Sequence, residues 1–202
     1  MTVNRNRCRP ISGPVFHHTT FATLKLDEMV EFYKKVAGLE PVFHGKGGAW
    51  LTNDAANHRI ALLALPDLIP PENKGHTSGL HHTAFEYDDF EAWVDHYERL
   101  AIEGIEPFMG LDHGMTMSMY YQDPEGNGVE IQVDNFADWR SSKEYMRTSQ
   151  DFSDNPIGEY FDPVKVVAAR ADGLSHAEVH RRAMAGTYRP EAIPEVHLPE
   201  LW

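Results

Sequence analysis

Two pairs of adjacent histidines and one glutamate have the residue types that bind a catalytic metal ion. The pairs are His17-His18 in VFHHTTFAT and His81-His82 in LHHTAFEY, and Glu130 lies between two apolar β-branched residues further along the chain. A buried carboxylate is costly unless it is paired or bound to a metal, although on a half-exposed strand it would simply face solvent. Two imidazoles, one from each pair, and one carboxylate with open coordination positions would form the facial triad of non-haem Fe(II) oxygenases.

The segment that carries Glu130, Leu111–Asp134, has the pattern of a β-hairpin. Residues 117–122 alternate between two faces with period 2, as a strand does. The sequence DPEGNG follows at residues 123–128 and supplies turn chemistry, because proline fixes one φ and glycine allows positive ones. The run VEIQV at residues 129–133 then forms a second strand.

An internal repeat would bring these elements together. Residues 80–87 match residues 16–23 at an offset of 64, which places one histidine pair over the other. At an offset of 69, Ala61 falls on Glu130. The offset grows along the repeat, as small loop insertions in the second copy would make it. We therefore predict an internal duplication, in which each copy has the element order β-α-β-β-β.

This order predicts an α+β fold. Two tandem βαβββ modules would form an open mixed β-barrel around a metal site, followed by a helical C-terminal extension. The first module would contain a helix capped by Asp27. The predicted boundaries are an N-terminal arm at 1–13, a first module at 14–65, a linker at 66–79, a second module at 80–134 and an extension at 135–202 with two helices, one starting at Asp162-Pro163 and one at Ser175.

Composition narrows the class of protein further. The chain has 202 residues, one cysteine and a formal net charge of −13. The charge argues against nucleic acid or an anionic membrane as a partner, and a lone cysteine excludes an intrachain disulfide. No apolar run approaches the roughly 20 residues that a membrane span needs, and the N-terminus lacks a signal-peptide core. We expect a cytoplasmic protein with no membrane or nucleic-acid partner.

At this point the chain resembles the vicinal oxygen chelate superfamily and, within it, the type I extradiol catechol dioxygenases. The resemblance covers about residues 14–134 and is carried by HHTTFATLKLDEMVEFY, HHTAFEYDDFEAWVDHY and SMYYQDPEGNGVEI. It implies that His18, His82 and Glu130 bind Fe(II), or alternatively Mn(II). Strand alternation would turn the neighbouring His17 and His81 the other way.

The resemblance also implies three catalytic side chains and the identity of the reactants. His58 would be the acid/base histidine, Tyr120 would hydrogen-bond a substrate hydroxyl, and His113 would correspond to a pocket histidine. The substrates would be a catechol, such as 2,3-dihydroxybiphenyl, and O₂. The family and the long tail also lead us to expect a homo-oligomer.

Other readings of the same scaffold remain open. One is a different metal-dependent reaction, by an isomerase, an epimerase or a fosfomycin-type thiol transferase. Another is a metal-free binding protein of the bleomycin-resistance kind. Glyoxalase I, in the same superfamily, uses a fourth protein ligand at the position that Ala61 occupies here, and alanine cannot bind metal. This difference favours an oxygenase over an isomerase.

Overall fold

Two mixed β-sheets with the same strand order form the framework of the molecule. The computed structural model describes residues 13–70, 72, 74–136 and 138–196. The first sheet has four strands in the order β1-β4-β3-β2, and the second has five in the order β5-β8-β7-β6-β9. In each sheet the first and fourth strands of a module pair in parallel, while the other neighbours are antiparallel.

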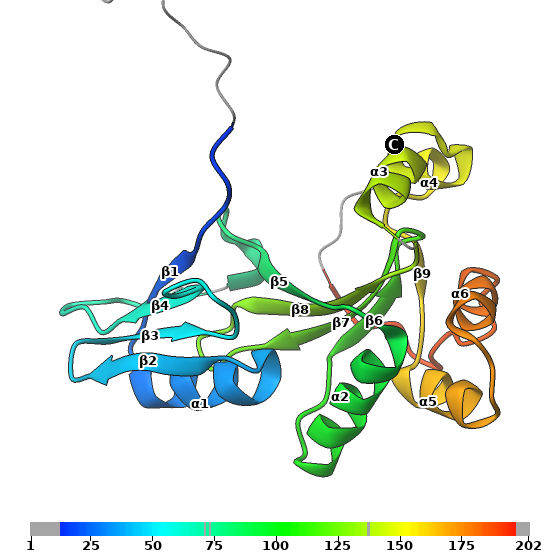
Figure 1. The fold of residues 1–202 in the computed structure, drawn as a ribbon. Helices are drawn as coiled ribbons and strands as arrows, with labels where there is room; N and C mark the ends of the chain where they lie inside the picture. Colours follow the sequence, from blue (N-terminus) through cyan, green and yellow to red (C-terminus); the bar gives the residue numbers. More distant parts are fainter. Residues whose placement is uncertain (1–12, 71, 73, 137, 197–202) are drawn as a thin grey trace, which may run out of the picture.

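The elements of each module follow the predicted β-α-β-β-β order (Figure 1). The first module consists of β1 Thr19–Ala22, α1 Leu26–Ala37, β2 Glu40–Gly45, β3 Gly48–Thr52 and β4 Ile60–Leu63. The second consists of β5 His82–Tyr87, α2 Phe90–Ile102, β6 Met109–Asp112, β7 Thr116–Gln122 and β8 Gly128–Asp134. The repeated topology and the open arrangement of the sheets confirm the predicted α+β fold.

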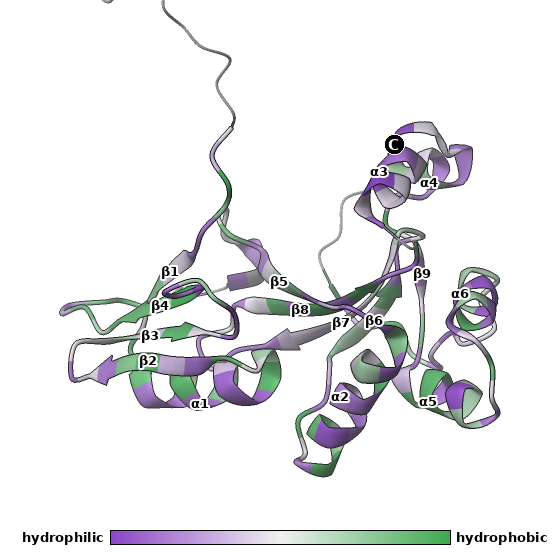
Figure 2. Ribbon diagram, in the orientation of Figure 1, coloured by the Kyte–Doolittle hydropathy of each residue, from purple (hydrophilic) through white to green (hydrophobic). Residues whose placement is uncertain are grey.

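The helices α1 and α2 pack their apolar faces against the strands and form the main core. Each helix carries both apolar and polar residues along its length (Figure 2), and the buried ones include Tyr33 of α1 and Trp93 of α2. The Trp93 indole donates a hydrogen bond to the backbone carbonyl of Ile131 at 2.9 Å. This bond fixes α2 beneath β8, the strand that carries Glu130.

The hairpin turn between β7 and β8 joins the two modules. Asp123 is buried and accepts hydrogen bonds from the backbone and side chain of Asn127, at 2.8 and 2.7 Å, and from the Tyr33 hydroxyl of α1 at 3.2 Å. Glu125 accepts a hydrogen bond from the Thr23 hydroxyl at 2.9 Å. The turn therefore binds the end of β1 and the middle of α1.

The C-terminal extension packs beside the second sheet and adds a strand to it. Its elements are α3 Trp139–Thr148, α4 Gln150–Asp154, β9 Glu159–Tyr160, α5 Pro163–Ala171 and α6 His176–Met184. The helices α5 and α6 begin after the caps Asp162 and Ser175, as predicted. The helices α3 and α4 and the strand β9 were not predicted. A short 3₁₀ turn, Lys74–His76, lies in the segment between the modules.

Some predicted boundaries differ from the observed ones. The helix α1 begins at Leu26 after Lys25, whose side chain forms no capping bond, so Asp27 is not its cap. The first strand covers Thr19–Ala22 only, and both His17 and His18 precede it. The arm expected at residues 1–13 lies, apart from Gly13, outside the described residues.

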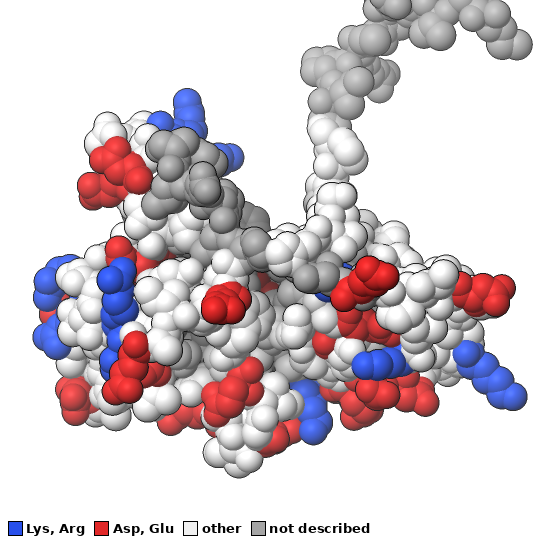
Figure 3. Space-filling model, turned by 180° about the vertical axis from the view of Figure 1, so that it is seen from behind, with Lys and Arg blue, Asp and Glu red and all other residues white. Residues whose placement is uncertain are grey.

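The lengths of the helices and the distribution of surface charge bear on the membrane and nucleic-acid partners that the sequence argued against. Among the described residues, no helix combines the length and apolarity required to span a bilayer. The face in Figure 3 shows acidic and basic side chains interspersed, without a continuous basic patch.

Candidate metal centre

Three neighbouring strands of the second sheet bring His82, Tyr120 and Glu130 together. Tyr120 of β7 lies directly opposite Glu130 of β8, so both side chains project from the same face of the sheet. On the other side of β8, Glu130 lies opposite Ala84, two residues after His82 on β5. Because residues i and i+2 of a strand share a face, His82 lies on the face that carries Glu130.

Hydrogen bonds connect these side chains to His113. The Nε2 atom of His82 lies 2.9 Å from Oε2 of Glu130. The Tyr120 hydroxyl donates a hydrogen bond to the other carboxylate oxygen at 2.8 Å, and the same hydroxyl lies 2.8 Å from Nε2 of His113. Both oxygens of the buried Glu130 carboxylate therefore have partners, which meets the condition for keeping it charged.

The environment shifts the pKa values of this group in different directions. Burial by itself would raise the pKa of Glu130, but hydrogen bonds from His82, Ser118 and Tyr120 outweigh it and leave the pKa below its usual value. Burial lowers the pKa of His113. Burial raises the pKa of Tyr120, and the adjacent Glu130 carboxylate raises it further. The carboxylate is thus anionic and the Tyr120 phenol protonated near neutral pH.

A second cluster of histidines lies in the first module, where β1 begins. The rings of His18 and His58 have their centroids 4.3 Å apart, and the ring of His17 lies 5.2 Å from His18 and 5.4 Å from His58. One ring nitrogen from each lies within 4.8 Å of the other two. Burial and the neighbouring His18 and His17 lower the pKa of His58.

The predicted site residues thus fall into two groups. His82, Tyr120, His113 and Glu130 form one group, and His18 lies with His58 in the other. Within the described part of the chain, His17, His18 and His58 are the only set of three potential ligands whose binding atoms all lie within 4.8 Å of one another. The His18 nitrogens therefore do not share so close a position with His82 and Glu130.

The expected opposite orientation of the paired histidines is wrong for both pairs. The Nδ1 atoms of His17 and His18 are 3.0 Å apart, and those of His81 and His82 are 2.8 Å apart. Strand alternation applies only inside a strand. Both histidines of the first pair precede β1, and His81 precedes β5, which begins at His82.

Two of the three predicted ligands, His82 and Glu130, have a spacing that fits one metal ion, whereas His18 lies with the other group. Two neighbouring ligands roughly 2.1 Å from one octahedral ion lie roughly 3 Å apart. The 2.9 Å separation of His82 Nε2 and Glu130 Oε2 matches that geometry. Two imidazoles and a carboxylate are a donor set suited to Fe(II) and Mn(II).

Sequence reasoning missed several residues around this group. Ser118, two residues before Tyr120 on β7, hydrogen-bonds Glu130, and its i, i+2 spacing from Tyr120 could have identified it. Asp112, which is fully buried beside His113, lies 2.8 Å from Nδ1 of His180 on α6. No pattern in the sequence indicates that Asp112 and His180, which are 68 positions apart, are in contact.

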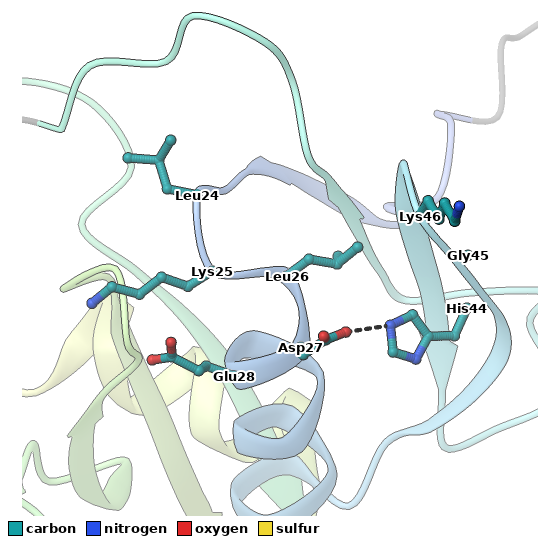
Figure 4. A pocket seen from close by; sticks show the side chains of 8 residues that line it. All are labelled: Leu24, Lys25, Leu26, Asp27, Glu28, His44, Gly45 and Lys46. Carbon is teal, nitrogen blue, oxygen red and sulfur yellow. Dashed lines mark hydrogen bonds and ion pairs between the residues drawn. The ribbon is translucent and has the colours of Figure 1, made fainter.

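A surface cavity of about 620 Å³ lies away from these residues, at the start of α1 (Figure 4). Its wall includes Lys25, Asp27, His44 and Lys46. The Asp27 carboxylate is already paired with Nε2 of His44 at 2.9 Å. None of the predicted site residues lines this cavity, so we assign it no part in the chemistry.

Comparison with known proteins gives an independent result. The sequence profile of the glyoxalase/bleomycin resistance protein/dioxygenase superfamily matches residues 15–131. Biphenyl-2,3-diol 1,2-dioxygenase 2 of Rhodococcus globerulus is 37% identical over 178 residues, which cover 88% of this chain and 93% of that protein. Biphenyl-2,3-diol 1,2-dioxygenase 3 of the same organism is 37% identical over 172 residues, which cover 85% and 90%. A solved lactoylglutathione lyase from Agrobacterium tumefaciens is 23% identical, with a TM-score of 0.47 over 62% of this chain and 96% of that one.

Proposed function

The chain belongs to the glyoxalase/bleomycin resistance protein/dioxygenase superfamily, and we propose that it is an extradiol dioxygenase that opens the ring of a catechol-type substrate with O₂. Two relatives that match nearly their whole length are biphenyl-2,3-diol 1,2-dioxygenases. A substituted catechol such as 2,3-dihydroxybiphenyl is therefore the substrate class that we propose. Both atoms of O₂ enter the product, so the reaction requires no external reductant.

The arrangement of His82, Tyr120 and Glu130 is the observation that carries this proposal. It combines two ligand atoms 2.9 Å apart with a phenol that hydrogen-bonds the carboxylate. A dioxygenase needs a metal site with open positions and a polar side chain beside it, and the close spacing of these ligand atoms and the adjacent hydroxyl support such a site here.

We propose Fe(II) as the metal, held by His82 and Glu130 together with His18, and Mn(II) as an alternative that suits the same ligands. When bound, the ion would supply Lewis acidity and electron transfer between a catechol and O₂ held side by side. His18 lies immediately before β1 and is exposed. A change in the exposed segment before Thr19 is the rearrangement that would complete the three-ligand set.

The remaining residues hold and move protons. His58 lies beside His18 and has a lowered pKa, so it is neutral at pH 7 and able to accept a proton from a catechol hydroxyl. Tyr120 would hydrogen-bond the second substrate oxygen, and His113 would place Nε2 beside the Tyr120 hydroxyl. The low pKa of Glu130 keeps this carboxylate available as an anionic ligand.

The test is anaerobic reconstitution with Fe(II), followed by catechol or 2,3-dihydroxybiphenyl in air. We expect one metal ion per chain, O₂ uptake and a yellow ring-opened product. His58→Ala should lose the product while keeping the metal, and the exposed neighbour variant Asn57→Ala is its control. A metal-loaded protein that cleaves none of these diols would overturn the assignment in favour of an isomerase or a transferase. A protein that binds no metal would be a ligand-binding protein instead.

A further inference from the structure

Three histidines of the first module meet beside the paired strands β1 and β4. His17 lies two residues before Thr19, where β1 begins. His58 lies two residues before Ile60, where β4 begins. Thr19 and Ile60 are partners in the parallel pairing of these strands, and the Thr19 N–H donates a hydrogen bond to the Arg59 carbonyl at 3.0 Å. The sheet therefore holds the segment with His17 and His18 level with the segment of His58.

The side chain of Arg59 joins the same two segments a second time. Its Nη1 donates a hydrogen bond to the His17 carbonyl at 2.9 Å. Its Nε and Nη2 donate to the Asp54 carboxylate at 3.0 and 2.7 Å, and Asp54 lies in the loop that leads to His58. Two separate contacts, one from the backbone and one from this side chain, therefore bring the histidines together.

The ring nitrogens of these histidines are close enough to share one ion. Nδ1 of His17 lies 3.0 Å from Nδ1 of His18, and the binding atoms of all three histidines lie within 4.8 Å of one another. Nitrogen ligands about 2.0–2.1 Å from a tetrahedral Zn(II) lie roughly 3.3 Å apart, so small rotations of the rings complete a three-nitrogen site. Since His17 and His18 are exposed, the fourth position would face solvent and take a water molecule.

The donor atoms distinguish this three-histidine cluster from the proposed catalytic centre. Within the described part of the chain, the set contains three imidazoles and no carboxylate. Asp54, on the same loop as His58, is already paired with Arg59. Imidazole nitrogens suit Zn(II), whereas carboxylate oxygens suit Mn(II), and three histidines with one water are a known ligand set of Zn(II). The cluster therefore favours Zn(II).

We propose that His17, His18 and His58 form a second divalent-metal site, which binds Zn(II) and competes with the catalytic ion. His18 belongs to both ligand sets, so Zn(II) in the cluster keeps His18 from joining His82 and Glu130. It also occupies His58, the proposed acid/base residue. The Zn(II) site itself depends on the cluster geometry alone, whereas the inhibition rests on the dioxygenase function proposed above.

Calorimetric titration of the full-length chain with Zn(II) alone tests the site in a variant that lacks the carboxylate ligand. Glu130→Gln leaves the cluster intact, and we expect it to bind one Zn(II) per chain. Adding His17→Gln should lower the Zn(II) affinity at least about 100-fold, beyond the 10- to 100-fold typical of residues that only support a ligand. The His17 side chain is exposed and its bond with Arg59 uses the backbone carbonyl, so the substitution leaves the fold intact.

The matched control is His81→Gln in the same Glu130→Gln background. His81 is also exposed and also has its Nδ1 close to that of the following histidine, at 2.8 Å, but it is not in the cluster. The Zn(II) affinity should stay within about 2-fold, because residues without shared partners act independently. A Glu130→Gln protein that binds no Zn(II), or one that loses affinity through His81→Gln and not through His17→Gln, would overturn the Zn(II) site.

X-ray absorption at the zinc edge identifies the ligands in Glu130→Gln. We expect three imidazoles and one oxygen in the first coordination shell, at about 2.0–2.1 Å. A shell with one imidazole or none would contradict the three-histidine cluster.

Competition is measured by adding Zn(II) during reconstitution of the otherwise wild-type chain with Fe(II). Zn(II) should suppress catechol cleavage. For half-inhibition, relative to its own rate without Zn(II), His17→Gln should need at least about 10-fold more Zn(II) than the wild type. His81→Gln should need the same amount as the wild type. Equal sensitivity of the wild type and His17→Gln would mean that Zn(II) acts at the catalytic centre, and the competition through the cluster would be excluded.

The two proposals fail in different ways. If the wild-type protein opens no catechol, the dioxygenase function fails, while the Zn(II) titration of Glu130→Gln still decides whether the cluster binds metal. If catechol is cleaved but Glu130→Gln binds no Zn(II), the cluster is not a metal site and the dioxygenase function stands.

Discussion

At the scale of single residues, the proposed metal site depends on the negative charge of Glu130. Glu130→Gln keeps the volume of the side chain but removes the negative charge, and its amide places an NH₂ donor where either His82 or Tyr120 now meets an acceptor oxygen. We expect metal affinity to fall by at least about 100-fold, beyond the 10- to 100-fold typical of residues that only support a ligand. Calorimetric titration with Mn(II) would measure the affinity.

The control for this variant is Glu86→Gln on the neighbouring strand. Glu86 is exposed and accepts hydrogen bonds from Gln132 and Trp139 at 2.7 Å each. It should bind metal as the wild-type protein does. Equal metal affinity in Glu130→Gln and Glu86→Gln would remove Glu130 from the ligand set.

A second residue-scale prediction concerns His96 on α2, which is far from the proposed chemistry. Burial first, and the neighbouring Arg99 second, lower its pKa to about 4, and its ring contacts the Tyr87 hydroxyl at 2.9 Å. The unfolded chain binds a proton at this residue near pH 6.5, so its contribution to stability is complete above that pH and decreases as the pH falls toward 4. At roughly 1.4 kcal/mol per pH unit, the loss reaches about 2 to 3 kcal/mol.

His96→Gln tests this prediction, because glutamine can still hydrogen-bond Tyr87 but does not titrate. Urea unfolding at pH 7 and pH 4.5 gives the two free energies of unfolding for each protein. The decrease on acidification should be about 2 to 3 kcal/mol smaller in the variant. If wild type and variant lose the same free energy, His96 does not titrate in this window.

The site residues show what a sequence can predict at this scale. Period 2 and the internal repeat indicated Glu130 and the two histidine pairs as potential ligands, since these signals are local or nearly so, whereas His18, His82 and Tyr120 were chosen through the family resemblance. The orientation of His17 relative to His18 was not predictable in the same way. Both residues precede the first hydrogen-bonded residue of β1, Thr19, and the position at which a strand begins depends on its pairing with β4.

At the scale of elements, the turn between β7 and β8 has a counterpart in the first module that serves as an internal control. The repeat aligns Asp54 with Asp123, and both carboxylates accept hydrogen bonds from the turn that follows them. Asp123 is buried and also receives the Tyr33 hydroxyl, whereas Asp54 is exposed. We therefore expect an alanine substitution to destabilise the protein more at Asp123 than at Asp54.

Asp123→Ala leaves buried donors without partners, and each such donor costs about 1 to 3 kcal/mol. We expect the free energy of unfolding to fall by about 3 kcal/mol or more, against about 1 kcal/mol or less for Asp54→Ala. Urea denaturation of the two variants measures the difference. Similar losses would mean that the β7–β8 turn does not join the modules as the contacts of Tyr33 indicate.

The helices differ in how far their sequences specify them. Asp162 before Pro163, and Ser175 three residues before Glu178, are capping signals, and α5 and α6 begin there. Helix α3 also has a capping aspartate, Asp138, but Ser142 is its only buried residue among those described. Without an apolar stripe, hydrophobic periodicity could not predict it.

At the scale of the whole molecule, the position of the C-terminal extension depends on contacts that no local pattern contains. The glycines at 110 and 158 allow Phe161 and the turn before β9 to approach β6, since a Cβ at either position would lie within 3 Å of backbone atoms. In sequence, these glycines are indistinguishable from loop glycines. The prediction therefore included the extension and its last two helices, but not its contact with the site.

Arg170 of α5 forms the main electrostatic contact between the extension and α2. Its guanidinium pairs with Asp95 and Glu98 and lies 3.5 Å from Glu91, while only 18% of its side chain is exposed. Arg170→Gln would leave three carboxylates close together without their common cation. We expect the free energy of unfolding to decrease by about 1 to 3 kcal/mol, because the Arg170 side chain is largely buried and its charged hydrogen bonds with Asp95 and Glu98 are lost.

Arg181→Gln on α6 is the matched control, since Arg181 pairs with Glu178 of its own helix and 66% of its side chain is exposed. Exposed pairs of this kind contribute about 0.5 kcal/mol or less. Urea unfolding gives the two energies, and hydrogen exchange should show faster exchange in α5 of Arg170→Gln only. Unchanged exchange in α5 would show that the apolar contacts of Val166 and Phe161 hold the extension without Arg170.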